Sequence, residues 1–520
     1  MKMPRLAIKD TNYRWVALSV TLIGAFMSVL DTSIVNIAIP KMMSAFAVGT
    51  EDAQWILTAY MLTMGVLQPI TGYLCDRFGA RRMYLLSLFI FIIGSALCGA
   101  AWSNDSMIVF RIFQAIGGGL LIPITMSIVF QEFPPKERNM AMGLWGISVA
   151  VAPAIGPTLS GYLVDYWNWR YIFTINIPVG LIGYILASLV LRESKTSQRA
   201  KFDFAGFATC SIGLFCLLLA LSKGVEKGWN SAYIISLLYI SVAALTLFVL
   251  IELNSDEPML DLSLFKDWNF ALGNLFTFVS FTILMGSMFL VPLFLENVLG
   301  YTAMQSGMLL LPAALVGGTL MPIAGKLADR FGAKILVLLG ALFAIGGTFP
   351  LIYLDLGTSY EYIVFTQILR GVFIGLSMMT VTVLSMSNVP GPKINRASAI
   401  NNTVRQLSGS FGIAILSTVL QNRQIYHLEH IAEKINYASP SAVSMIHYGE
   451  RLFLHNGSSP GVAHQQSLAL INGIVQRQTA IFAFDDAFWV LGMFAIVSIG
   501  TALLLKSARP TDKKVVVMMD

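Results

Sequence analysis

The chain has 520 residues, of which 56% are hydrophobic and only 12% are charged. Soluble domains carry charge on about a quarter of their residues, so this composition excludes a protein whose whole surface faces water. The net charge of +6 does not require a nucleic-acid partner, because the positions of the basic residues account for it, as described below.

The chain begins with a basic segment, Lys2 to Arg14, followed by an apolar run from Trp15 to about residue 38. This run is longer than the apolar part of a signal peptide, contains Asp31 and has no small-residue cleavage site. We therefore expect a retained first transmembrane helix.

A helix needs about 20 mostly apolar residues to cross the bilayer. Fourteen runs of this kind follow one another along the chain, near residues 15–38, 53–74, 83–101, 106–130, 140–164, 171–191, 204–221, 231–251, 270–295, 304–325, 335–354, 361–386, 397–420 and 484–505. They predict an all-α membrane protein with 14 transmembrane helices.

The basic residues lie mainly in every second connection between these runs. Arg77, Arg192, Lys326 and Lys506 are examples, and all fall on the side of the N-terminus if successive runs alternate in direction. Short loops rich in Lys and Arg stay in the cytoplasm. The bias predicts that both termini are cytoplasmic, and it explains the positive net charge.

A loop motif occurs twice, as Gly72–Arg81 and again as Gly325–Lys334, each time after the second run of a half. Eight runs lie between the two copies, so the simplest division is six helices, an inserted pair and six more helices. We place the N-terminal bundle at 1–191, the inserted pair with its linkers at 192–269 and the C-terminal bundle at 270–520. Parallel halves of this kind are typical of transporters whose substrate site lies between them.

The repeated loop suggests an inner latch. Its first glycine permits close helix approach, its second permits a positive φ in a tight turn, and its aspartate can pair with an arginine or cap a helix. The residues assigned to the latch are Gly72, Asp76, Arg77, Gly79, Arg81, Gly325, Asp329, Arg330, Gly332 and Lys334. The alternative is that the loop only anchors the topology through its positive charge.

The clearest charged residues inside apolar runs are Asp31, Arg111, Arg370 and Arg405. Each costs about 2.5–3.5 kcal/mol in the bilayer centre, so each needs a reason. Asp31 and Arg111 lie at similar depths from the outer side and could share one electrostatic environment. We predict that they couple transport to protons, with Glu296 as a second acid; the alternative is a static polar contact. Arg405 could snorkel to the inner surface.

Polar and aromatic residues within the runs are candidates for a substrate cavity that binds bulky aromatic cations through stacking and cation–π contacts. The set is Asn36, Trp55, Tyr60, Gln68, Gln114, Trp145, Asn274 and Arg370. Structural packing and interfacial anchoring are the alternatives for each of them. In the fifth run, Pro153, Gly156, Pro157 and Gly161 predict a bent helix that could serve as a pivot.

The segment 421–483 is polar and contains all five histidines. We interpret it as a partly helical outer loop rather than a metal site or a pH sensor, because no ligand cluster completes a site. The four cysteines form no CxxC pair either. We expect no metal and no cofactor, with the proton gradient as the driving force.

These motifs resemble those of the major facilitator superfamily, in particular its fourteen-helix drug:proton antiporter branch of the EmrB/QacA type. The stretches that carry the resemblance are Gly72–Arg82, Arg111–Gly119, Ala152–Gly161, Leu30–Pro40 and Trp167–Gly180. Ser160 stands where the antiporter motif has a glycine, and Glu296 where the branch has a glutamine.

The resemblance implies that Arg111 takes part in proton transfer. It also implies export of lipophilic or cationic drugs across the bacterial cytoplasmic (inner) membrane in exchange for protons, by rocking of two bundles.

Two other functions stay open at this point. One is a dedicated exporter or importer of a single metabolite, lipid or antibiotic; the other is a membrane sensor or scaffold that no longer transports. We do not expect an enzyme, because the sequence has no nucleotide-binding loop and no nucleophile–base motif. The expected partners are small-molecule substrates, protons and lipid, and the question of a periplasmic or accessory partner is open.

Overall fold

The computed structural model describes residues 10–193, 202–255, 258–434 and 439–507, and the regular structure in these ranges is helical throughout. The N-terminal bundle is built from α1 (Asp10–Phe46), α2 (Thr50–Leu67), α3 (Thr71–Phe78), α4 (Ala80–Gly99), α5 (Asn104–Glu132), α6 (Pro135–Tyr166), α7 (Tyr171–Thr174) and α8 (Asn176–Val190). The inserted pair consists of α9 (Phe204–Lys227) and α10 (Ala232–Asn254).

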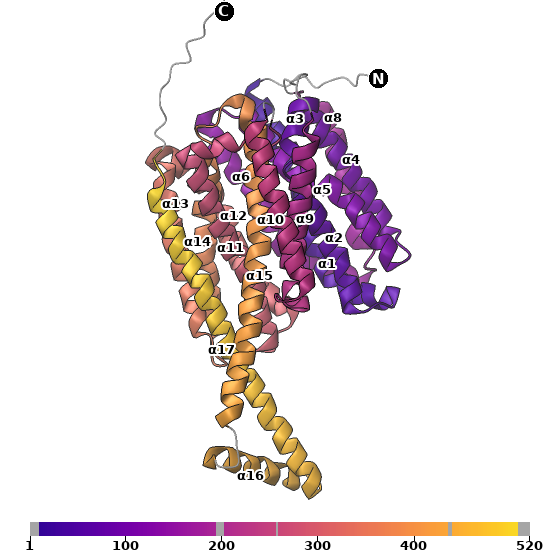
Figure 1. Ribbon diagram of the computed structural model, residues 1–520, viewed down its shortest axis with the longest axis vertical. Coiled ribbons are helices and arrows are strands. Elements are labelled where there is room, and N and C mark those ends of the chain that lie inside the picture. Colours follow the sequence, from indigo (N-terminus) through magenta and orange to yellow (C-terminus); the bar gives the residue numbers. More distant parts are fainter. Residues whose placement is uncertain (1–9, 194–201, 256–257, 435–438, 508–520) are drawn as a thin grey trace, which may run out of the picture.

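The C-terminal bundle follows. It contains η1 (Leu262–Lys266), α11 (Trp268–Asn297), α12 (Ala303–Phe331), α13 (Ala333–Thr348), η2 (Phe349–Tyr353), α14 (Tyr360–Ser385), η3 (Gly391–Lys393), α15 (Ile394–Lys434), α16 (Pro440–His455) and α17 (Pro460–Leu504). The two bundles stand side by side with their long helices running in roughly one direction (Figure 1).

Within the described ranges, 11 helices or joined helices are long and apolar enough to cross a membrane, and 12 if the bent α6 is counted. The two remaining predicted runs, 53–74 and 397–420, are also helical, as α2 with α3 and as α15. They are less apolar because α2 starts with Glu51 and Asp52 and because α15 is rich in polar residues. The fourteen-helix architecture therefore combines apolar spans with two polar ones.

The chain enters α1 and leaves α17 at the same face, which also carries the two repeated loops (Figure 1). We call it the inner face, following the charge bias of the loops, and the opposite face the outer face. The bundles meet where α6 packs on α12 and where α15 packs on α3 and α5.

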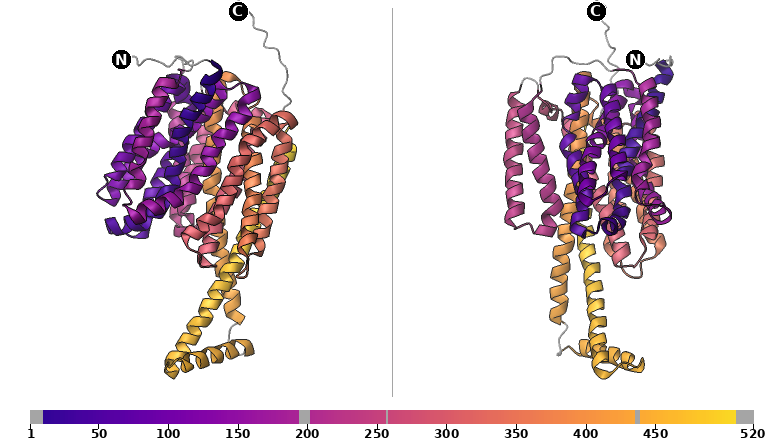
Figure 2. Two further views of the ribbon diagram at one scale, coloured as in Figure 1. Left: turned by 180° about the vertical axis from the view of Figure 1, so that it is seen from behind. Right: turned by 90° about the vertical axis from the view of Figure 1, so that its right-hand side faces the viewer.

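The inserted pair packs against the outside of this boundary, as the right-hand view of Figure 2 shows. Its first helix, α9, contacts α2 of one bundle and α15 of the other. After α9, the Trp229 indole N–H donates to Thr418 Oγ1 at 2.8 Å. The pair therefore touches both halves of the molecule.

The outer face carries a helical protrusion, formed by the segment that was predicted to be a partly helical outer loop. Helix α15 has 41 residues and α17 has 45, so each is roughly 60 Å long, twice the thickness of the hydrocarbon core. They extend beyond the bundle, and α16 lies across their tip (Figure 1). Helix α15 continues beyond the predicted run that ends at 420, because residues 421–434 contain no glycine or proline to end the helix, and α17 begins before the predicted run that starts at 484.

Candidate functional site

Asp31 lies at the centre of a hydrogen-bonded cluster inside the N-terminal bundle. Its side chain is 0% exposed, and Arg111 Nη1 from α5 lies 2.5 Å from Oδ2. The other oxygen, Oδ1, accepts hydrogen bonds from Gln114 Nε2 at 2.9 Å and from Asn176 Nδ2 at 3.1 Å. Both oxygens are thus satisfied by donors, which suits an ionised carboxylate paired with a guanidinium.

A second layer of contacts holds these donors. Ser95 Oγ in α4 accepts from Gln114 Nε2 at 2.6 Å and from Asn176 Nδ2 at 3.1 Å. The guanidinium of Arg111 lies over the Tyr60 ring at 3.8 Å, and its Nε donates to the Ile56 carbonyl at 3.4 Å. Four helices of one bundle, α1, α4, α5 and α8, and the ring from α2 enclose the cluster.

Glycines explain why the helices come this close. A Cβ added to Gly94 in α4 would lie 2.5 Å from the Gln114 Cα, and one at Gly117 in α5 would lie 2.4 Å from the Ser87 carbonyl. A side chain at either position would push α4 and α5 apart. The glycines therefore set the distances on which the Asp31 hydrogen bonds depend.

Two residues of this cluster were predicted to line the substrate cavity instead. Tyr60 and Gln114 were assigned to the substrate cavity, but they contact Arg111 and Asp31 because the rotation of α2 and α5 turns them toward the cluster. Ser95 was missed, and Asn176 appeared only within the Trp167–Gly180 stretch. Glu296 is exposed at the outer end of α11 and does not join the cluster.

The other predicted cavity residues come from both bundles. Trp145 is buried and its indole N–H donates to Thr125 Oγ1 at 3.0 Å. Buried Asn274 donates to the Phe270 carbonyl, and Arg370 donates to Gln367 Oε1 at 2.8 Å. Gln68 is buried, Asn36 is exposed, and half-buried Trp55 has the Lys223 ammonium 5.6 Å from its ring centre.

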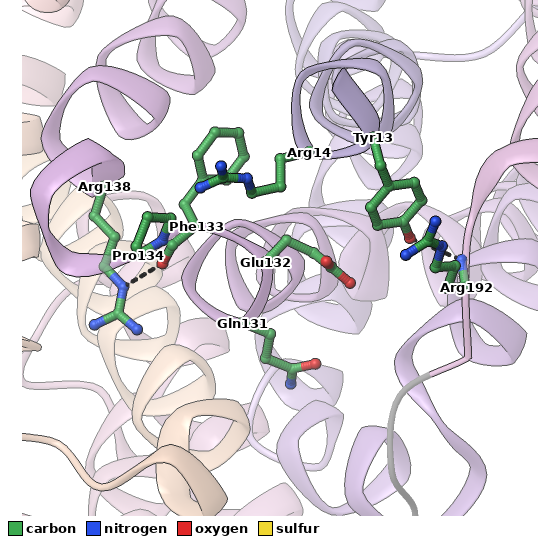
Figure 3. Close-up of a pocket in the computed structure, with 8 residues that line it drawn as sticks. All are labelled: Tyr13, Arg14, Gln131, Glu132, Phe133, Pro134, Arg138 and Arg192. Atoms are coloured by element: carbon green, nitrogen blue, oxygen red, sulfur yellow. Dashed lines mark hydrogen bonds between the residues drawn. The ribbon is translucent and has the colours of Figure 1, made fainter. Parts of the chain in front are cut away.

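One hollow lies at the inner end of the N-terminal bundle and measures about 570 Å³ (Figure 3). Its arginines already have partners: Arg14 pairs with Glu137 at 3.0 Å, and Arg138 Nε donates to the Phe133 carbonyl at 2.9 Å. A smaller hollow of about 410 Å³ at the outer end includes Trp55, Asp52 and Asp105. Neither hollow reaches Asp31.

The two repeated loops each contact the opposite bundle at the inner face. Asp76 Oδ1 accepts from Asn395 Nδ2 at 2.6 Å, and Asp76 Oδ2 lies 3.2 Å from Arg396 Nε. Asp329 Oδ1 accepts from Asn139 Nδ2 at 2.6 Å. Burial raises the pKa of Asp76 above its ordinary value, and the bonds from Asn395 and Arg396 offset only part of that rise. The inner face is closed in this conformation.

The repeated glycines act as their positions predict. Gly79 and Gly332 have φ of 88° and 90°, a region that residues with a side chain rarely adopt. A Cβ at Gly72 would lie 2.8 Å from the Arg396 Cα, and one at Gly325 would lie 2.6 Å from the Asn139 carbonyl oxygen. These last two glycines let the loops reach the opposite bundle.

The basic residues of the repeated loops bind within their own bundles. Arg77 donates to the Tyr73 hydroxyl, Arg81 to the Ser188 carbonyl and Lys334 to the Leu503 carbonyl, while Arg330 lies over the Phe331 ring. The expected arginine partner of Asp76 is Arg396, from α15 and not from the loop. The crossing contacts described above are therefore made by the two aspartates.

Helix α6 connects the Asp31 helix with the opposite bundle. It bends by 41° between Pro135–Pro153 and Thr158–Val164, at the predicted pivot. Gly156 packs against Ser33, and Ser160 Oγ donates to the Ile34 carbonyl of α1 at 2.6 Å. Gly143, nearer the inner end, packs against the backbone of α12. Gly161 faces open space, and the side chain of Pro157 lies outside the described residues.

Comparison with known proteins agrees with this architecture. Residues 21–413 match the Major Facilitator Superfamily. The chain is 32% identical to the multidrug export protein EmrB of Haemophilus influenzae, over 94% of each chain. It is 31% identical to the fatty acid resistance protein FarB of Neisseria gonorrhoeae, over 96% of this chain and 97% of that protein.

Solved structures share the fold at low sequence identity. The human organic anion transporter MFSD10 superposes with a TM-score of 0.62 at 12% identity, covering 93% of this chain and 99% of that one. The proton:xylose symporter XylE superposes with a TM-score of 0.59 at 14% identity, covering 94% of this chain and 97% of that one.

Proposed function

Because this chain belongs to the major facilitator superfamily, we propose that it exports lipophilic or cationic compounds from the cytoplasm in exchange for protons. The superfamily consists of transporters, so the chain is a transporter rather than an enzyme. Relatives that match over more than nine-tenths of its length are named as multidrug export and fatty acid resistance proteins. The observation that carries the proton-coupled part is the buried pair of Asp31 and Arg111 within membrane-spanning helices.

The closed inner face defines one end of the transport cycle. Asp76 and Asp329 each bind the opposite bundle there, so substrate in this conformation has no path from the cytoplasm. Opening the inner side requires both loops to release their partners while the bundles rock. Substrate then enters between the bundles, and the return movement releases it outside.

The proton step takes place at Asp31. In the closed conformation the carboxylate is sealed from solvent and neutralised by Arg111, so a proton reaches it only when the contact opens. The cluster lies within one bundle, and rocking alone does not separate its members. A shift of the bent α6 against α1 at Gly156 and Ser160 is the link that carries bundle movement to Asp31.

The single acid in the Asp31 cluster limits the stoichiometry. Since Glu296 is exposed and apart from the cluster, one proton per cycle is expected. Exchange of one proton for one monovalent cation is electroneutral and draws only on the pH gradient, about 1.4 kcal/mol per unit. The membrane is the bacterial cytoplasmic membrane, with both termini on its cytoplasmic side.

The coupling is tested in inverted vesicles that contain the full chain. Addition of substrate should release protons, and Asp31→Asn should abolish this release because the amide cannot exchange a proton. Asp52→Asn is the matched control, since Asp52 is exposed in the first turn of α2. Undiminished exchange in Asp31→Asn would refute the proposed coupling.

The breadth of the substrate range is tested separately. Cells without their own pumps should extrude a panel of dyes and quaternary amines, and a protonophore should stop the efflux. A dedicated exporter would ignore most of the panel, and a sensor or scaffold would extrude none of it.

A further inference from the structure

The two bundles treat their buried arginines differently. Arg111 in the N-terminal bundle is 1% exposed and has Asp31 as its counter-ion. Arg370 and Arg405 in the C-terminal bundle are 3% and 7% exposed. Within the described part of the chain, neither has a carboxylate within ion-pair distance. A buried charge without a counter-ion is strongly unfavourable, so each of the two needs an explanation.

Arg405 is the less satisfied of the two. Its Nη2 donates to Thr382 Oγ1 at 2.6 Å, while its Nε is buried and has no hydrogen-bond partner among the described residues. A guanidinium has five N–H donors, so most of its capacity is unused by the contacts described here. Snorkelling does not relieve it, because Arg405 lies 11 residues from the inner start of α15, roughly 17 Å deep and near the middle of the core.

The surroundings of Arg405 come from both bundles. Its guanidinium carbon lies 5.5 Å from the ring centre of Trp145 in α6 and 5.1 Å from that of Phe281 in α11. Flat aromatic rings suit an apolar body that packs against them. This place therefore combines one positive charge with apolar walls at the boundary where the bundles separate.

We infer that Arg405 binds the acidic group of an amphipathic organic anion, such as a carboxylate on an alkyl chain, that is carried between the bundles. A carboxylate supplies the missing counter-ion and accepts from the unused donors of the planar guanidinium. The apolar tail then packs on the rings of Trp145 and Phe281. An organic cation at the same place is repelled. The inference rests on the proposed export function and names a substrate class for it.

The test compares two probes with the same tail and opposite charge, laurate and dodecyltrimethylammonium. Their binding to the full chain in lipid nanodiscs is measured at neutral pH. Arg405→Gln should weaken laurate binding by about tenfold or more, as expected when a charged hydrogen bond is lost, and should leave dodecyltrimethylammonium binding unchanged or tighter. Arg405→Lys should lie between, because it keeps the charge without the planar fork. Arg451→Gln on exposed α16 is the control for net charge.

Equal laurate affinity in the unaltered protein and in Arg405→Gln would overturn the inference. If both Arg405→Gln and Arg405→Lys bind neither probe, the inference is also overturned, because this result would show that Arg405 has a purely structural role. Export of dodecyltrimethylammonium from cells reports on the proposed function independently. If export occurs but Arg405 does not affect laurate, only the anion site is wrong. If no probe is exported but laurate binding depends on Arg405, the site stands and the proposed function fails.

Discussion

Asp76 and Arg396 are joined across the two halves of the molecule, with Asp76 Oδ2 3.2 Å from Arg396 Nε. The corresponding contact of the other half joins Asp329 to Asn139, so a neutral amide replaces the guanidinium. The inner face is therefore closed by two similar but unequal contacts. Asp76 also accepts a second hydrogen bond, from Asn395 Nδ2.

Removing the Asp76 side chain should favour opening of the inner face. Asp76→Ala leaves Asn395 and Arg396 without their acceptor, and both are largely buried in the closed conformation. We expect the free energy that favours the closed state over the open state to fall by about 1–3 kcal/mol. Spin labels at Arg82 and Gly391, which are both exposed at the inner face, should show a larger fraction of long distances. An unchanged distance distribution would contradict the latch.

The same contact should respond to pH. Burial raises the pKa of Asp76 in the closed state above its ordinary value of 3.8, so the closed state binds this proton more tightly than an open state with exposed Asp76. Protonation of Asp76 therefore favours the closed state as the pH falls from the raised pKa toward 3.8. This contribution is lost again as the pH rises above the raised pKa. The spin-label distances measured over this range report the effect. In Asp76→Asn, which keeps an acceptor oxygen but cannot titrate, this part of the pH dependence should disappear.

A side chain at Gly325 should hold the inner face open. Its Cβ would lie 2.6 Å from the Asn139 carbonyl oxygen of the opposite bundle, too close for the helices to keep their contact. Gly325→Ala should increase the fraction of long distances between spin labels at Arg82 and Gly391. Gly307→Ala in the same helix has no atom within 4 Å of the new Cβ and is the matched control. Equal distance distributions in the two variants would count against the close approach.

The turns after Asp76 and Asp329 should be sensitive to loss of glycine. Gly79 and Gly332 have positive φ with ψ of 140° and 138°, and a side chain there costs about 1–3 kcal/mol. Gly79→Ala and Gly332→Ala should both lower the midpoint of thermal unfolding in detergent. Gly161→Ala, in open space on α6, should leave it nearly unchanged. A fall of the same size in all three variants would show that the effect does not come from the turns.

Part of the Asp31 cluster could be predicted from sequence and part could not. The pairing of Asp31 with Arg111 followed from their similar depths, because a helix rises by a constant amount per residue. Ser95 and Asn176 come from two other helices, and their inclusion depends on how each helix is rotated about its axis. Runs that are apolar all round do not encode that rotation, which also explains why Tyr60 and Gln114 were assigned to a cavity.

Composition and local pattern by themselves determined the membrane-spanning character, the positions of the runs, the repeated loop and the backbone form of Gly79 and Gly332. These properties depend on residues close together in the chain or on transfer of each segment into lipid, so they need no knowledge of the neighbours. Only the tertiary structure decided that Asp76 meets Arg396, that Arg405 has no counter-ion among the described residues, and that α15 and α17 continue as a protrusion. These properties depend on which helix faces come together and on where the membrane boundary falls across a continuous helix, and no single segment specifies either of them.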